Sequence, residues 1–277
     1  MTKMHIAGLE QGSVDIGGGT QLYWEAVGTG RPILFVHGLW ASSRFFRRQL
    51  EAVGRHHRAI ALDLRGHGRS SMTPGGHTVP TLAADLRAFI RALGLERPIL
   101  VGWSMGALIA WEYHLQFGSE DIGGLVVIDQ APTDFRYPGC EDALVGIAEM
   151  HDWAAQVLTN RNQFMRAVLP MMFHRQPDDE AADWMSNEMC SAPEAIAAAI
   201  FVDQCLRDYR GMIADYDVPT LVCSGDCSAQ PRSGAEFLRD RLPRGELRLF
   251  ADCGHCLFWE DADGFNEALL SFVERLA

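Results

Sequence analysis

The chain has 277 residues, of which 48% are hydrophobic and 22% charged, the ordinary balance of a globular protein with a sizeable core. Its 24 Lys and Arg against 36 Asp and Glu give a formal net charge of −12, which argues against nucleic acid or an anionic membrane as a partner, because both bind basic patches. The N-terminus lacks the apolar core of a signal peptide, and no apolar run is long enough to span a bilayer, so we expect a cytoplasmic protein.

Strand-like and helix-like segments alternate through the first 131 residues. Two β-prone stretches, 13–16 and 21–26, flank the turn sequence GGGT and predict a hairpin. Short apolar runs then alternate with segments of helical apolar spacing: the predicted strands are 33–36, 59–62, 99–101 and 125–128, and the predicted helices are 44–53, 81–93 and 105–117. This alternation is typical of a parallel sheet covered by helices on both faces. We therefore predict an α/β fold with a mostly parallel central sheet of about eight strands.

The alternation stops after residue 131 and resumes at residue 217. The intervening stretch has no good strand candidate, but it has four helix-prone segments, at 141–158, 162–173, 179–189 and 193–206. Two more strands, 220–223 and 247–250, and two more helices, 234–242 and 264–276, follow it. The sequence thus predicts a core domain made of residues 1–131 and 217–277, interrupted by an all-helical cap (lid) domain at residues 132–216.

Residues 102–106 are GWSMG, a match to the pattern G-x-S-x-G that lies between a predicted strand and a predicted helix. A turn this sharp crowds the backbone, and glycines two residues on either side relieve the crowding and leave the serine hydroxyl accessible above the sheet. The N-terminus of the following helix offers free N–H groups and a partial positive charge, which suit an oxyanion. Ser104 is therefore the candidate nucleophile.

Four sequence blocks, in this order, resemble the α/β-hydrolase fold superfamily: HG at 37–38, LDLRGHGRS at 62–70, GWSMG at 102–106, and CGH at 253–255 with Glu260. The sequence is identified as a member of that superfamily and is similar to its serine esterases and lactonases that carry a helical cap. The resemblance implies that His255 is the general base and acid. It also implies that the backbone N–H groups of Leu39 and Met105 form the oxyanion hole.

The acid that orients His255 is not where most of this superfamily has it. Most members place an Asp at the end of a G-x-x-D turn, and in Gly225-Asp226-Cys227-Ser228 the matching position is a serine. A serine hydroxyl cannot supply the negative charge that stabilises an imidazolium. Asp129, at the end of the preceding predicted strand, can reach the same imidazole from the neighbouring position, as in certain dehalogenases and lactonases. We favour Asp129 as the acid and keep Asp226 as the alternative.

A serine nucleophile implies acyl chemistry, so the expected substrate is a small-molecule carboxylic ester or lactone attacked through an acyl-enzyme. Trp40 and Trp103 flank the expected oxyanion hole and are candidate walls of the substrate pocket. Trp153 and Trp184, in the helical insertion, either complete an apolar roof over that pocket or pack only within the insertion. We expect a substrate with an apolar or aromatic part.

No metal or cofactor is expected. Cys253 and Cys256 match C-x-x-C, but they follow a predicted strand near the C-terminus, and no second ligand pair stands at zinc-finger spacing. The glycine-rich stretches lack the strand–G-x-G-x-x-G–helix layout of dinucleotide sites. Three alternative functions remain open: hydrolysis of a carbon–carbon bond, a cofactor-free haloperoxidase or perhydrolase activity, and a non-catalytic ligand receptor.

Overall fold

An eight-stranded sheet forms the centre of the computed structural model, which describes residues 6–276. Its order is β1-β2-β4-β3-β5-β6-β7-β8. The pairs β1–β2 and β2–β4 are antiparallel, and all other neighbouring pairs are parallel. The predicted α/β fold with a mostly parallel sheet is therefore confirmed. The strands are β1 (Glu10–Asp15), β2 (Gln21–Val27), β3 (Pro32–Val36), β4 (Arg58–Leu62), β5 (Ile99–Trp103), β6 (Gly124–Ile128), β7 (Thr220–Gly225) and β8 (Gly245–Phe250).

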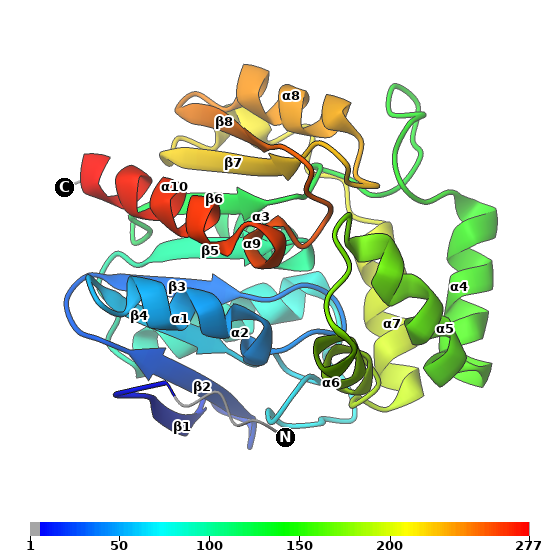
Figure 1. Cartoon of the computed structure of the whole chain (residues 1–277), viewed down its shortest axis with the longest axis horizontal. Helices are drawn as coiled ribbons and strands as arrows, with labels where there is room; N and C mark the ends of the chain where they lie inside the picture. Colours follow the sequence, from blue (N-terminus) through cyan, green and yellow to red (C-terminus); the bar gives the residue numbers. More distant parts are fainter. Residues whose placement is uncertain (1–5, 277) are drawn as a thin grey trace.

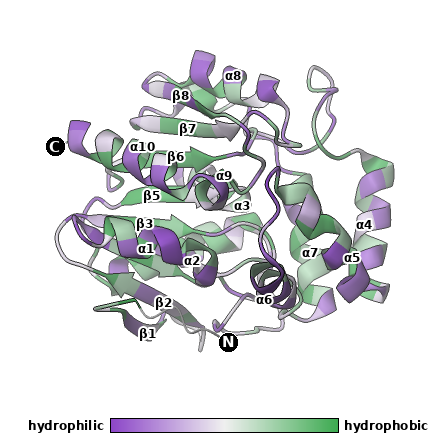
Figure 2. Ribbon diagram, in the orientation of Figure 1, coloured by the Kyte–Doolittle hydropathy of each residue, from purple (hydrophilic) through white to green (hydrophobic). Residues whose placement is uncertain are grey.

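Both faces of the sheet are covered, because alternate residues of each central strand point to opposite sides. In β3, Ile33 and Phe35 join one apolar cluster, whereas Leu34 and Val36 join the other. The central strands are accordingly hydrophobic along their length (Figure 2). On one face lie the short helix η1 (Ser43–Phe46), α1 (Arg47–Val53), α9 (Leu257–Glu260) and α10 (Ala262–Arg275); on the other lie α2 (Val79–Ala92), α3 (Met105–Phe117) and α8 (Arg232–Arg241) (Figure 1).

Four helices between β6 and β7 lie beyond the carboxyl ends of the parallel strands (Figure 1). They are α4 (Ile147–Thr159), α5 (Arg161–Val168), α6 (Asp179–Met189) and α7 (Glu194–Cys205), with the short turns η2 (Leu169–Met172) and η3 (Ile213–Asp215). Helix α4 packs against α7, and α5 packs against α6. We call α4–α7 the cap helices; their status as a separate domain at 132–216 remains a prediction.

One predicted helix begins later than expected. The segment 141–158 was expected to be helical throughout, but α4 begins at Ile147. Val145 instead forms a β-bridge with Phe135, and the N–H of Gly146 donates to Glu149 Oε2 at 3.2 Å as a cap.

Within residues 6–276, no helix combines the length and the apolar composition that crossing a membrane requires.

Candidate active site

Ser104 lies in the sharp turn between β5 and α3, with a backbone φ of 53° and ψ of −122°. Such a conformation is strained for a residue with a side chain, and it persists only where its surroundings force it. The two flanking positions must be glycine because a side chain there would clash with backbone atoms. A Cβ on Gly102 would lie 2.6 Å from Ala107 N, and one on Gly106 would lie 2.1 Å from Val36 O. The sequence pattern thus corresponds to a turn that only these glycines permit.

His255 lies within reach of a carboxylate that comes from a different strand. Its Nδ1 is 2.7 Å from Oδ2 of Asp129, the residue that follows β6. Asp129 has φ = 49° and is 1% exposed. Its other oxygen, Oδ1, accepts hydrogen bonds from Ser224 Oγ and from the N–H of Gly225, both at 3.2 Å. Asp129 is thus a buried acceptor that can hold the proton of His255 on Nδ1 and leave Nε2 free as a base.

Ser228, at the position that matches the Asp of the G-x-x-D turn, also contacts Asp129. Its hydroxyl donates a short hydrogen bond to Asp129 Oδ2 and accepts the N–H of Gln230 at 3.1 Å. Ser228 therefore supports the carboxylate of the neighbouring strand instead of supplying one. Asp226 is exposed, and its backbone N–H donates to Phe250 O at 3.0 Å. Among the described residues, His255 has no contact with the Asp226 carboxylate.

The two backbone N–H groups expected in the oxyanion hole belong to Leu39 and Met105. In the described part of the chain neither donates to a protein acceptor, so both are available to a ligand oxygen. Met105 is the first residue of α3, where N–H groups have no acceptor inside the helix. Leu39 lies in the loop 37–40, beside Trp40, which has φ = 60°.

Two buried histidines hold the loop 37–40 in place. His37 Nε2 accepts the N–H of Leu64 at 3.0 Å, so Nδ1 carries the proton and donates to Gly38 O at 2.7 Å. His67 Nε2 accepts the N–H of Trp40 at 3.2 Å, and its Nδ1 donates to the carbonyl of Arg65 at 3.0 Å. Burial lowers the pKa of His37 to about 4 and that of His67 to about 3, so both are neutral near pH 7. These histidines position the loop; they do not face the cavity as bases.

We expect this pair to make the fold sensitive to acid. Because the folded-state pKa values lie below the ordinary value near 6.5, the unfolded chain binds more protons between about pH 6.5 and pH 4. The free energy of unfolding should therefore fall as the pH falls through that window, by up to about 1.4 kcal/mol per pH unit for each histidine. Urea unfolding at pH 7, 6 and 5 measures this slope. The slope of a His67→Gln variant should be smaller, because the variant has lost one titrating group. An unchanged slope would contradict the claim that burial lowers the pKa of His67 in the folded protein.

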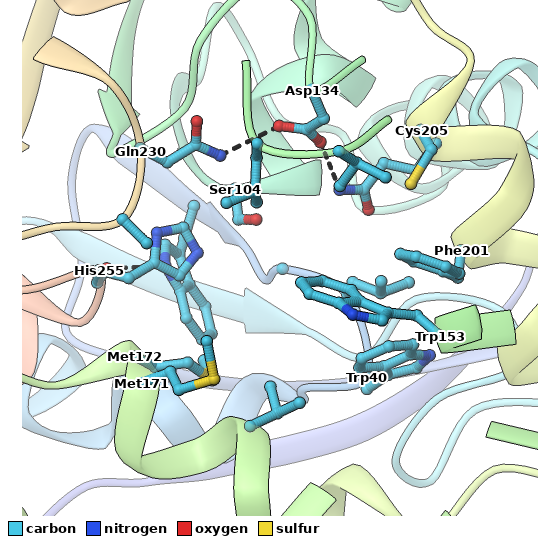
Figure 3. Close-up of a pocket in the computed structure, with 18 of the residues that line it drawn as sticks. Trp40, Ser104, Asp134, Trp153, Met171, Met172, Phe201, Cys205, Gln230 and His255 are labelled. Carbon is cyan, nitrogen blue, oxygen red and sulfur yellow. Dashed lines mark hydrogen bonds between the residues drawn. The ribbon is translucent and has the colours of Figure 1, made fainter. Parts of the chain in front are cut away.

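A cavity of about 130 Å³ opens beside Ser104 and His255 (Figure 3). Trp40, Trp103 and Trp153 line it, together with Phe201 and three methionines, Met171, Met172 and Met189. Its size is below the 300 Å³ or more that is usual for sites of drug-sized ligands, so it suits a small substrate. Three of the four expected tryptophans thus lie at this cavity.

Trp184 lies outside the cavity and packs against the core instead. Its ring centre is 5.1 Å from that of Phe45 and 5.8 Å from that of Trp259, and the guanidinium of Arg44 lies 4.3 Å above it. The α6 segment that carries Trp184 faces η1 and α9, so this side chain packs α6 against those two elements and is not among the residues that line the cavity. The expectation that Trp184 lines the substrate pocket is therefore wrong.

One group of cavity residues was not expected from the sequence. Asp134, Gln204 and Gln230 form a second polar part of the cavity, besides Ser104, Ser228 and His255. They come from the segment after β6, from α7 and from the segment after β7, and no local pattern marks any of them. They could have been found only from the tertiary arrangement.

The C-x-x-C cysteines are buried free thiols on the chain segment that carries His255. Burial raises the pKa of both Cys253 and Cys256, which disfavours the thiolate that redox chemistry and metal binding use. Among residues 6–276, no group of three or more His, Cys, Asp or Glu side chains is arranged to hold a metal ion.

The chain matches the alpha/beta hydrolase family over residues 33–268. It is 30% identical over 256 residues to the AB hydrolase superfamily protein YisY of Bacillus subtilis, covering 91% of this chain and 94% of that protein. It is 29% identical over 268 residues to a non-heme haloperoxidase of Rhodococcus erythropolis, covering 92% and 97%. The solved esterase EaEST of Exiguobacterium antarcticum has the same fold, with a TM-score of 0.91, 24% identity and coverage of 95% and 98%.

Proposed function

Since this chain belongs to the alpha/beta hydrolase family and is a hydrolase of that fold, we propose that it cleaves a small carboxylic ester or lactone through an acyl-enzyme on Ser104. The observation that carries the proposal is the 2.7 Å contact between His255 Nδ1 and Asp129 Oδ2 beside a cavity that Ser104 also lines. In this assignment Ser104 is the nucleophile, His255 the general base and acid, and Asp129 the orienting acid. Asp226 has no part in it.

In the first half-reaction, Ser104 Oγ attacks the carbonyl carbon while His255 Nε2 accepts the hydroxyl proton. The developing oxyanion receives hydrogen bonds from the N–H groups of Leu39 and Met105. His255 then gives the proton to the leaving oxygen, and the ester or lactone bond breaks. In the second half-reaction, His255 deprotonates a water that attacks the acyl-enzyme, and Ser104 leaves with the proton returned.

Covalent labelling tests this assignment. A fluorophosphonate should phosphonylate the protein once, and mass spectrometry of the digested protein should place the label on Ser104, because only an activated serine attacks such a reagent quickly. Labelling should disappear in a Ser104→Ala variant, and wild-type protein should hydrolyse p-nitrophenyl acetate. A protein that stays unlabelled and inactive towards a panel of esters and lactones would contradict the proposal and favour a ligand receptor.

The similarity to the Rhodococcus haloperoxidase favours a second candidate, formation of a peracid. The same acyl-enzyme would be attacked by hydrogen peroxide instead of water, which releases the peracid and restores Ser104. Comparing hydrolysis with peracid yield from one acyl donor, with and without peroxide, distinguishes the two activities. The choice between them depends on what enters the cavity after acylation.

A further inference from the structure

The second polar part of the cavity is built around Asp134, a carboxylate that is 3% exposed. Its Oδ1 accepts hydrogen bonds from Gln130 Nε2 at 2.8 Å and from Gln230 Nε2 at 3.0 Å, and its Oδ2 accepts one from Gln204 Nε2 at 2.8 Å. Figure 3 shows Asp134 and Gln230 on one side of Ser104, with Trp40 and Trp153 on the other. The catalytic proposal uses none of these four polar side chains.

The orientation of the three glutamines leaves their acceptor atoms unused. A carboxylate oxygen accepts from N–H donors, so each amide turns its nitrogen toward Asp134 and its oxygen away. In the described chain, the Oε1 atoms of Gln130, Gln204 and Gln230 are buried without a hydrogen-bond partner. A buried acceptor without a partner costs about 1–3 kcal/mol. Gln204 and Gln230, only 6% and 8% exposed, line the cavity, but these oxygens are covered, so either amide must turn before its oxygen can accept from a donor group bound there.

The charge of Asp134 also has no counter-ion. Within residues 6–276 no Arg, Lys or His pairs with it, and the only basic side chain that lines the cavity is His255. The three contacts to Asp134 come from neutral amides, which stabilise a buried charge less than a cation does. The cavity therefore combines a carboxylate and two unpartnered acceptors at one end, which together match the donors of an ammonium group.

The opposite wall suits an apolar or aromatic body. Trp153 and Phe201 are stacked, with ring centres 5.9 Å apart, and the Trp40 and Phe201 ring centres are 5.6 Å apart. Aromatic faces bind both apolar groups and cations. A ligand with an aromatic or aliphatic body and a terminal ammonium would contact both ends of the cavity.

We propose that the cavity selects esters that carry an ammonium group, with that group bound by Asp134, Gln204 and Gln230 and the apolar body on Trp40, Trp153 and Phe201. This deepens the proposed function by naming its substrate class. It rests on that function for the reaction, whereas ammonium binding itself needs no turnover. Equilibrium binding can therefore test it separately.

Calorimetry at pH 7 with two probes of nearly equal shape tests the proposal. Benzylammonium should bind wild-type protein about 10-fold or more tightly than benzyl alcohol, because its positive charge offsets the negative charge of a buried carboxylate, whereas the alcohol offers only a neutral donor. In Asp134→Asn this preference should disappear. Asp240→Asn is the matched control: it removes one carboxylate from an exposed ion pair with Arg239, and it should keep the preference.

Gln204→Leu provides a second variant, since Asp134→Asn alters the hydrogen bonds of three glutamines at once. It removes the Oε1 acceptor together with the Nε2 donor to Asp134 Oδ2, and it should weaken benzylammonium binding by about 3- to 10-fold, with benzyl alcohol binding no more weakly than in wild type. Circular dichroism and the unfolding midpoint verify that each variant is folded. Equal affinity of wild-type protein for the two probes, no benzylammonium binding, a preference that survives in Asp134→Asn, or benzylammonium binding that Gln204→Leu leaves unchanged would overturn the proposal. Labelling of Ser104 would still support the hydrolase assignment after any of these results.

Discussion

Asp129→Asn is expected to lower kcat on p-nitrophenyl acetate by up to about 10⁴ while the protein stays folded. An amide has nearly the same shape, but it has no charge to stabilise the imidazolium that forms as Ser104 attacks. It can also turn an N–H toward His255 Nδ1, which would favour the wrong tautomer and leave Nε2 protonated. The measurement is kcat and KM for the variant and wild type under identical conditions.

Asp226→Asn is the matched control for this prediction. It makes the same chemical change two residues before Ser228, on an exposed side chain that does not contact His255. We expect its kcat to stay within about 3-fold of wild type, as for surface substitutions that touch no reacting group. A collapse of activity in Asp226→Asn with little change in Asp129→Asn would return the acid to the segment after β7 and refute our assignment.

Gly106→Ala is expected to destabilise the fold by about 3 kcal/mol or more and to lower activity together with it. A Cβ at this position would lie 2.1 Å from Val36 O, 2.9 Å from Val36 C and 3.2 Å from His37 O. These are backbone atoms of β3 and of the segment that follows it, so they cannot rotate away as a side chain can. The start of α3 would have to move away from β3, which displaces Ser104 and the loop 37–40. Urea unfolding measures the loss.

Gly211→Ala serves as the comparison for that substitution. Gly211 is exposed, its backbone does not require a positive φ, and a Cβ there would meet nothing within 4 Å. The variant should unfold within about 0.5 kcal/mol of wild type. If Gly106→Ala were equally harmless, the close approach of α3 to β3 would not be the reason for a glycine at this position.

The order of strands and helices could be predicted from the sequence because it depends on local patterns. Apolar runs such as 125–128 have to be buried on both faces, and the breaks between runs follow glycines and polar turns. The serine turn is local in its pattern, because Ser104 and the two glycines lie within five residues, although the space at Gly106 is limited by Val36 of β3. The predicted start of α4 is wrong, because its cause is not local. A β-bridge between Phe135 and Val145 competes there with helix formation.

The sequence by itself determined the fold class, the strained serine turn and the absence of an acid at position 228, because each follows from neighbouring residues. Only the tertiary structure decided that Ser228 supports Asp129, that Trp184 packs against Phe45 and Trp259, and that Asp134, at the cavity wall, accepts hydrogen bonds from three glutamines. Except for that between Gln130 and Asp134, these contacts join residues that lie tens of residues apart in the chain. Their geometry depends on how the cap helices and the strand ends pack, and no local propensity encodes that packing.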